Sequence, residues 1–198
     1  MTIEQTVAFA GFALVVAGTP GPSNALLTAT GAAVGVLRGV PALLGVAAGM
    51  AALMFLVVIG LDTINLQTPL IVSAIKWAGA AVLLWMAWKI ATSPVGDHQY
   101  QGRPIGFVGA AAFQWINPKS WLACVSAAAT FVDPAHESAY LQGALLALIF
   151  VLVALPSCFL WLAFGAAIQR GLRSATAQHI FNGAMGIVLV ASVVVLVL

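Results

Sequence analysis

The stretch Thr19-Pro20-Gly21-Pro22-Ser23-Asn24 lies inside an apolar run that extends from about residue 6 to about residue 36. This run is longer than the roughly 20 helical residues that span a bilayer. Each proline removes a backbone donor and clashes with the preceding turn, so the triplet breaks a membrane helix and leaves carbonyl groups near residues 16–18 without helical partners. Unpaired backbone at membrane depth is tolerated only where it is buried in protein or lines a wet cavity. The break therefore predicts a polar site; the alternative interpretation is a plain proline kink packed against another helix.

The composition indicates an integral membrane protein with little mass outside the bilayer. Of the 198 residues, 63% are hydrophobic and 6% are charged, and the mean hydropathy is +1.10; soluble domains carry about 25% charged residues. A formal net charge of +2 without a polybasic run argues against nucleic acid as a partner. Cys124 and Cys158 lie in apolar stretches and are interpreted as small buried hydrophobes.

Enzyme chemistry is not indicated. The histidines lie in predicted loops or at the end of a span, and no metal-ligand spacing occurs in the sequence. Acid–base catalysis needs titratable groups within reach of a substrate, and the predicted spans offer no such cluster. We therefore expect no catalytic residues, no cofactor and no metal.

The apolar runs predict one transmembrane domain over residues 1–198 with six helical spans. We place the spans at about residues 6–36, 40–61, 69–91, 105–132, 140–168 and 179–198. Lys and Arg occur in the loops after spans one, three and five, namely Arg38, Lys89, Arg103, Arg170 and Arg173. The loops after spans two and four contain only acidic charges. Because positively charged loops stay in the cytoplasm, the chain is predicted to cross the membrane several times with both termini outside.

Two halves of three spans each, residues 1–95 and 104–198, are separated by a polar segment. A second break, Gln114-Trp115-Ile116-Asn117-Pro118-Lys119-Ser120, lies in span four, and a shift of 98 residues places Pro20 on Pro118. An odd number of spans per half makes the second half enter from the opposite side, which is an inverted repeat. The predicted fold is an all-α integral membrane protein with six transmembrane helices in two inverted three-helix repeats, with spans one and four broken. The alternative is coincidence in a biased composition.

Lys119 is the most informative residue, because a charge at the centre of a span costs about 2.5–3.5 kcal/mol. No Asp or Glu lies deep in a predicted span, so a substrate carboxylate could serve as counter-ion, together with free N–H groups of the helix that restarts after Pro118. Asn24, Asn117 and the freed carbonyls could accept hydrogen bonds from an ammonium group, which together suits a zwitterion. The alternative is that Lys119 snorkels or donates to freed carbonyls. The candidate substrate-binding residues are Pro20, Gly21, Pro22, Ser23, Asn24, Gln114, Asn117, Pro118 and Lys119.

Glycines at four-residue spacing, as in Gly31, Gly35 and Gly39 and again in Gly45 and Gly49, predict close helix packing. A transporter is the function that these features favour, since broken helices in corresponding positions typify secondary transporters. A small-solute channel is the runner-up, because a polar cavity could also be a pore. A non-transporting assembly subunit is the third class, although a scaffold has no need of paired breaks.

The chain resembles the LysE/RhtB family of amino-acid exporters. The resemblance is carried by Pro20-Gly21-Pro22 with Asn24, by Gly39, Gly45 and Gly49, and by Asn117-Pro118-Lys119; residues 77–81 and 87–94 are similar to the cysteine/O-acetylserine exporter branch. Ser23 stands where many members carry Asn. The resemblance implies export of small amino acids or derivatives, of the cysteine, O-acetylserine or homoserine kind, across the bacterial inner membrane, driven by the proton gradient. The expected partners are this substrate and membrane lipid, and a homodimer is the oligomer considered.

Overall fold

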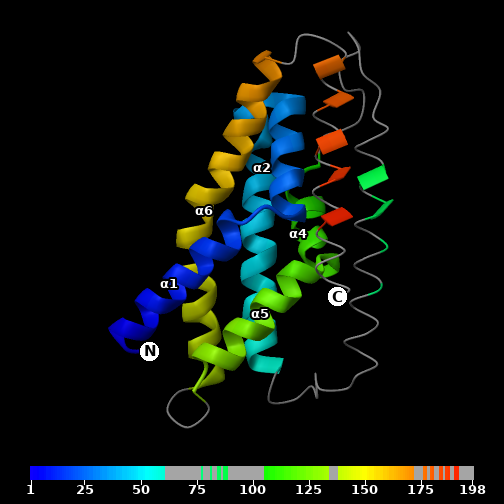
Figure 1. Ribbon diagram of the computed structural model, residues 1–198. Helices are drawn as coiled ribbons and strands as arrows, with labels where there is room; N and C mark the ends of the chain where they lie inside the picture. Colours follow the sequence, from blue (N-terminus) through cyan, green and yellow to red (C-terminus); the bar gives the residue numbers. More distant parts are fainter. Residues whose placement is uncertain are drawn as a thin grey trace.

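The computed structural model is entirely helical over the residues that it describes (Figure 1). These are residues 1–60, 77, 81, 84–85, 87–88, 105–133, 138–171, 176–177, 179–180, 183–184, 186–187 and 190–191. Most of predicted spans three and six and the whole segment between the halves lie outside these residues. The same is true of four basic residues: Lys76, Lys89, Arg103 and Arg173. Predicted spans one, two, four and five can be compared with the structure.

Span one is broken where the sequence predicts. Helix α1 (Ile3–Gly18) begins with a capping box in which Thr2 and Gln5 exchange hydrogen bonds, and it ends before Thr19. Helix α2 (Pro22–Gly60) starts at the second proline of the triplet. Proline suits this first helical position, because its missing N–H would have no partner there.

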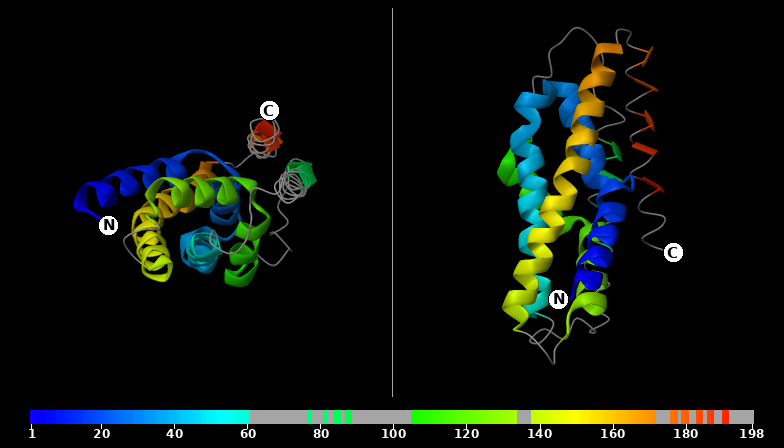
Figure 2. Two further views of the ribbon diagram at one scale, coloured as in Figure 1. Left: turned by 90° about the horizontal axis from the view of Figure 1, so that it is seen from below. Right: turned by 90° about the vertical axis from the view of Figure 1, so that its left-hand side faces the viewer.

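Span two is joined to span one by a shorter turn than expected. The loop predicted at Arg38 is wrong: the chain reverses at Gly35, the one residue of α2 with non-helical backbone angles, φ 76° and ψ 177°. This conformation favours glycine, because a Cβ would clash with the backbone. The two parts of α2, before and after Gly35, run antiparallel to each other (Figures 1 and 2). A 39-residue helix would otherwise be about 58 Å long, nearly twice the hydrocarbon thickness.

Span four is also broken where predicted, into α4 (Phe107–Ile116) and α5 (Pro118–Phe131). Span five is α6 (Ala139–Gly171), which continues as one helix through Pro156. In Figures 1 and 2, α1 and the first part of α2 lead from the lower end of the molecule to the upper end, whereas α4 and α5 lead downward. The two broken spans therefore pass through the structure in opposite directions.

Glycines allow these helices to approach closely. A Cβ on Gly165 of α6 would overlap the Thr28 carbonyl of α2, and a Cβ on Gly31 would overlap the Leu162 carbonyl of α6. Gly45 and Gly49 approach the α4 backbone in the same way. Gly39 packs against the Leu162 side chain. The predicted small-residue contacts are thus confirmed, except that Gly35 makes the turn.

Two described helices are long and apolar enough to cross a membrane, α2 and residues Ala139–Ile168 of α6. Helices α1 and α4 are apolar but shorter, because the breaks end them. Large hydrophobic side chains such as Leu14, Leu152 and Leu160 are more than half exposed. Exposed apolar surface of this kind is typical of a lipid-facing bundle.

Candidate functional site: a cavity between two helix breaks

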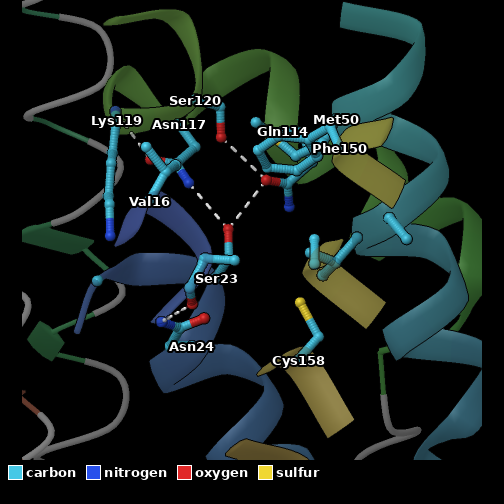
Figure 3. Close-up of a pocket in the computed structure, with 15 residues that line it drawn as sticks. Val16, Ser23, Asn24, Met50, Gln114, Asn117, Lys119, Ser120, Phe150 and Cys158 are labelled. Carbon is cyan, nitrogen blue, oxygen red and sulfur yellow. Dashed lines mark hydrogen bonds between the residues drawn. The ribbon is translucent and has the colours of Figure 1, made fainter. Parts of the chain in front are cut away.

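At the first break, Asn24 replaces the missing backbone donors. Its Nδ2 donates to the carbonyl oxygens of Ala17, at 2.9 Å, and Thr19, at 2.8 Å. The Asn24 side chain is buried, and Figure 3 shows it below Ser23. The sequence interpretation gave these freed carbonyls to a substrate ammonium; in the structure Asn24 already binds two of them.

At the second break, Asn117 caps the helix that follows it. Its Oδ1 accepts from the backbone N–H of Lys119 at 3.1 Å, and its carbonyl accepts from the N–H of Ser120 at 3.0 Å. Pro118, at the first helical position, has no N–H. The prediction that α5 offers free N–H groups to an anion is therefore wrong for its first turn.

The start of α2 differs from the start of α5 in this respect. Its N-cap residue is Gly21, which has no side chain to accept from the N–H groups of Ser23 or Asn24. Neither N–H has an acceptor among the described residues. Both breaks contain the positive end of a helix dipole, but only the helix start at the first break has N–H groups without a cap.

Lys119 crosses from the second break to the first. Its Nζ donates to the Thr19 carbonyl oxygen at 2.7 Å. The side chain passes over Gly21, where a Cβ would lie 2.9 Å from Lys119 Cδ and 3.0 Å from Nζ. The contact is the one that the alternative interpretation of Lys119 gave, donation to a freed carbonyl, and Gly21 leaves room for it.

A hydrogen-bond network beside Lys119 joins the two breaks (Figure 3). Ser23 Oγ donates to Gln114 Oε1 at 2.9 Å and accepts from Asn117 Nδ2 at 3.0 Å. Ser120 Oγ donates to the same Gln114 oxygen at 2.9 Å, and Gln114 Nε2 donates to the Ala110 carbonyl at 3.2 Å. In the described part of the chain, every side-chain polar atom that is itself fully shielded from solvent has a hydrogen-bond partner. Satisfied buried networks of this kind fix one geometry, so the groups that face the cavity are preorganised.

These groups form one side of a cavity with a volume of about 40 Å³. A volume of this size holds about three water molecules. The polar side contains six predicted residues, Gly21, Ser23, Asn24, Gln114, Asn117 and Lys119, and also Ser120. The other lining residues are apolar or weakly polar: Val16, Ala17, Val46, Ala47, Met50, Phe150, Ala154 and Cys158. Pro20, Pro22 and Pro118 do not line the cavity; they create the breaks around it.

The electrostatics of the cavity are dominated by one charge. Among the described residues that line it, Lys119 is the only ionisable group besides the Cys158 thiol, and none carries a carboxylate. No group of three or more His, Cys, Asp or Glu suited to a metal occurs in the described ranges. The arrangement can bind a small molecule with a negative group near Lys119 and an apolar portion on the other side.

Sequence reasoning did not identify the residues of α6 and of the second part of α2. Phe150, Ala154 and Cys158 recur every four residues, so they share one helix face. Their neighbours on the other faces are equally apolar, and this spacing carries no signal by itself. Ser120 could have been found, since it directly follows Lys119.

Comparison with known proteins gives a consistent result. The family profile described as "LysE type translocator" matches residues 14–198. The chain is 35% identical over 138 residues to the cysteine/O-acetylserine efflux proteins of Salmonella typhi and Salmonella paratyphi A, and 36% identical to that of Escherichia coli K12. Each alignment covers 70% of this chain and 71% of the relative. No solved structure matches the chain.

Proposed function

Because this chain belongs to the LysE-type translocator family, we propose that it exports small amino acids or their derivatives through the cavity between the two helix breaks. The similar efflux proteins are named for cysteine and O-acetylserine, and we propose substrates of this kind. The observation that carries the proposal is the ammonium group of Lys119, which faces a cavity whose described lining contains no carboxylate.

The substrate carboxylate binds Lys119. Lys119 is only partly buried, but an ammonium group that is partly withdrawn from water is stabilised by an anionic or strongly polar partner, and among the described residues its Nζ contacts a single carbonyl. The uncapped N–H groups of Ser23 and Asn24 belong to the first turn of α2, which begins next to Gly21. The Lys119 side chain passes over Gly21 and so lies near this helix start. An anion between them would receive charge-assisted hydrogen bonds from both sides. The sequence-based proposal is thereby moved from the start of α5 to the start of α2.

The substrate ammonium binds on the Thr19 side. When Lys119 turns to a carboxylate, the Thr19 carbonyl loses its 2.7 Å partner and can accept from the ammonium group. Asn24 Oδ1, which accepts no hydrogen bond from the described residues, is a second acceptor. A zwitterion would thus replace one intramolecular hydrogen bond by two sets of charged contacts, one for each of its ends.

The architecture around the site is proposed to be six spans in two inverted repeats, residues 1–95 and 104–198. The opposite directions of the two broken spans, and their meeting at Ser23 and Asn117, support this proposal. The repeat relation requires that spans one to three superpose on spans four to six after a two-fold rotation about an axis in the membrane plane. An experimental structure with parallel halves would contradict it.

The orientation is proposed to place both termini on the periplasmic side of the bacterial inner membrane. The turn of α2 and the C-terminal end of α6 lie at the upper end in Figures 1 and 2, and the end of α5 and the start of α6 lie at the lower end. In the sequence, Arg170 belongs to the last turn of α6, and Asp133 follows α5. The upper end is then cytoplasmic by the positive-inside rule. A Gln101→Cys variant should resist an impermeant thiol reagent added to intact cells; labelling from outside would overturn this orientation.

We propose that transport is coupled to protons. We also propose that membrane lipid surrounds the exposed apolar side chains. The homodimer stays a prediction. The test uses purified protein in liposomes, with O-acetylserine or cysteine and an imposed pH gradient. Uphill accumulation that a protonophore abolishes is expected. Downhill flux alone would indicate the small-solute channel, and no flux for any small amino acid would favour the assembly subunit.

A further inference from the structure

The side of the cavity that faces the polar network is built by α6. Phe150, Ala154 and Cys158 are spaced by four residues and point the same way, and each is almost fully buried, with 3%, 1% and 4% of its surface exposed. In Figure 3 the sulfur of Cys158 points into the space between α6 and the residues Ser23 and Asn24. The site therefore has a second, chemically different half.

The second part of α2 completes this half with Val46, Ala47 and Met50. None of the six side chains is charged, so a charged group placed among them would lose its hydration without gaining a partner. Ala47 and Ala154 are the small members and leave room, whereas Met50 can adapt its shape to different occupants. We name these six residues the apolar wall.

We propose that the apolar wall holds the side chain of the transported amino acid and that Ala154 limits the length of this side chain. The class selected is α-amino acids with a short, uncharged side chain, such as a hydroxyl, a thiol or a small ester. This inference rests on the proposed function, and it adds the residues that choose among amino acids sharing the same zwitterionic end.

The first test is Ala154→Leu, which extends a side chain into the cavity. Transport is measured in proteoliposomes for serine, which has a two-atom side chain, and for O-acetylserine, whose side chain is longer. The half-saturating concentration of O-acetylserine should rise about tenfold or more, and that of serine by less than about threefold, in line with pocket discrimination by single groups. Ala167→Leu, on an exposed part of α6, is the matched control and should change neither. Equal effects on both substrates, or none, would overturn the assignment.

The second test leaves the apolar wall intact. A Cys124→Ala variant keeps Cys158 as the single cysteine, because the chain has two, and Cys124 is buried away from the cavity. Reaction of Cys158 with methyl methanethiosulfonate is then timed by mass spectrometry. O-acetylserine at ten times its half-saturating concentration should slow the reaction about tenfold, since only the free fraction reacts. Glycine, which has no side chain, should slow it less than about threefold at the same relative concentration.

The two proposals fail in different ways. If O-acetylserine is transported in a Lys119-dependent manner but leaves Cys158 fully reactive, or if glycine protects as well as O-acetylserine, the apolar wall is not the side-chain site and the exporter proposal stands. If no amino acid is transported or protects, the exporter proposal itself fails. As a reagent control, Cys124 in a Cys158→Ala variant should react at a rate that the substrate does not change.

Discussion

Lys119 Nζ and the Thr19 carbonyl oxygen lie 2.7 Å apart, although 100 positions separate the two residues in the sequence. The hydrogen bond joins the two helix breaks, one from each half of the chain. Each break supplies what the other lacks: the first offers a carbonyl that no helix uses, and the second offers an ammonium without a carboxylate partner in the described lining of the cavity. A substrate with both charges can replace this contact at both ends.

Gly21→Ala should separate stability from transport. The new Cβ would lie 2.9 Å from Lys119 Cδ, so the lysine must move, and it can do so cheaply because it is a flexible side chain. We expect the free energy of unfolding in detergent to fall by no more than about 1 kcal/mol, which is the usual range for a change at an N-cap. The initial rate of O-acetylserine transport should fall about tenfold, which corresponds to about 1.4 kcal/mol.

The control for this variant is Gly11→Ala in α1, where a Cβ would meet nothing within 4 Å. It should stabilise the protein by about 0.5–1 kcal/mol, as is usual for glycine replaced inside a helix. Full transport activity of Gly21→Ala would show that the position of Lys119 over Gly21 is not needed.

Ser23→Ala should weaken the network that joins the breaks. The change removes the donor to Gln114 and the acceptor of Asn117, both of which are buried. Gln114 Oε1 keeps its hydrogen bond from Ser120, whereas Asn117 Nδ2 loses its acceptor. Leaving one such buried group unpaired costs about 1–3 kcal/mol, which a thermal melt in detergent would detect. Ser126→Ala, at an exposed position of α5, should have almost no effect. Equal melting temperatures for the two variants would mean that the network contributes little.

Pro22→Ala should give a folded protein that does not transport. Pro22 starts α2 without an N–H, and alanine there would add a donor and allow the helix to extend toward Thr19. The carbonyl that holds Lys119 would then be lost to a helical hydrogen bond. Membrane insertion and size-exclusion profile test the fold, and liposome flux tests transport, with Pro41→Ala at an exposed position as control. Normal flux through well-folded Pro22→Ala protein would count against the site.

Gly165→Ala should destabilise the packing of α6 on α2. A Cβ at this position would overlap the Thr28 carbonyl, which belongs to the backbone and cannot turn away. Overpacking of this kind costs about 1–3 kcal/mol. The variant should melt at a lower temperature in detergent or fail to accumulate in the membrane. Wild-type stability would show that α2 and α6 can separate at this contact without cost.

The sequence was sufficient for the breaks and for the contact of Lys119 with a freed carbonyl, because proline and buried charge have strong local effects. It was not sufficient for the reversal at Gly35, since several glycines nearby are equally able to turn the chain. It also missed the apolar wall. In a uniformly apolar helix such as α6, the lipid-facing and protein-facing residues have the same character, so periodicity does not identify Ala154.

The capping of the two helix starts was predicted in the wrong place for a similar reason. Asn117 and Gly21 occupy the same N-cap position in α5 and α2, but only the asparagine has a side chain that can accept from the next turn. The symmetry of the two breaks suggested equal roles, and the difference between these two side chains makes them unequal. The site thus depends on where the halves differ as well as on where they match.

The central claim, that Lys119 binds the carboxylate of an amino acid, is tested most directly by substrate binding to Lys119→Met in detergent or liposomes. Truncating one partner of a buried charged pair costs about 2 kcal/mol or more, so the affinity for O-acetylserine should fall about 30-fold or more while the fold persists. Lys119→Arg should also bind poorly, because its planar group does not match a compact ammonium. Lys76→Met is the matched control: Lys76 lies about two turns into predicted span three, where the sequence predicts that it snorkels to the nearer membrane surface, so this variant should bind almost as wild type does. If Lys119→Met binds as tightly as wild type and Lys76→Met does not, Lys119 is the wrong lysine and the account is contradicted.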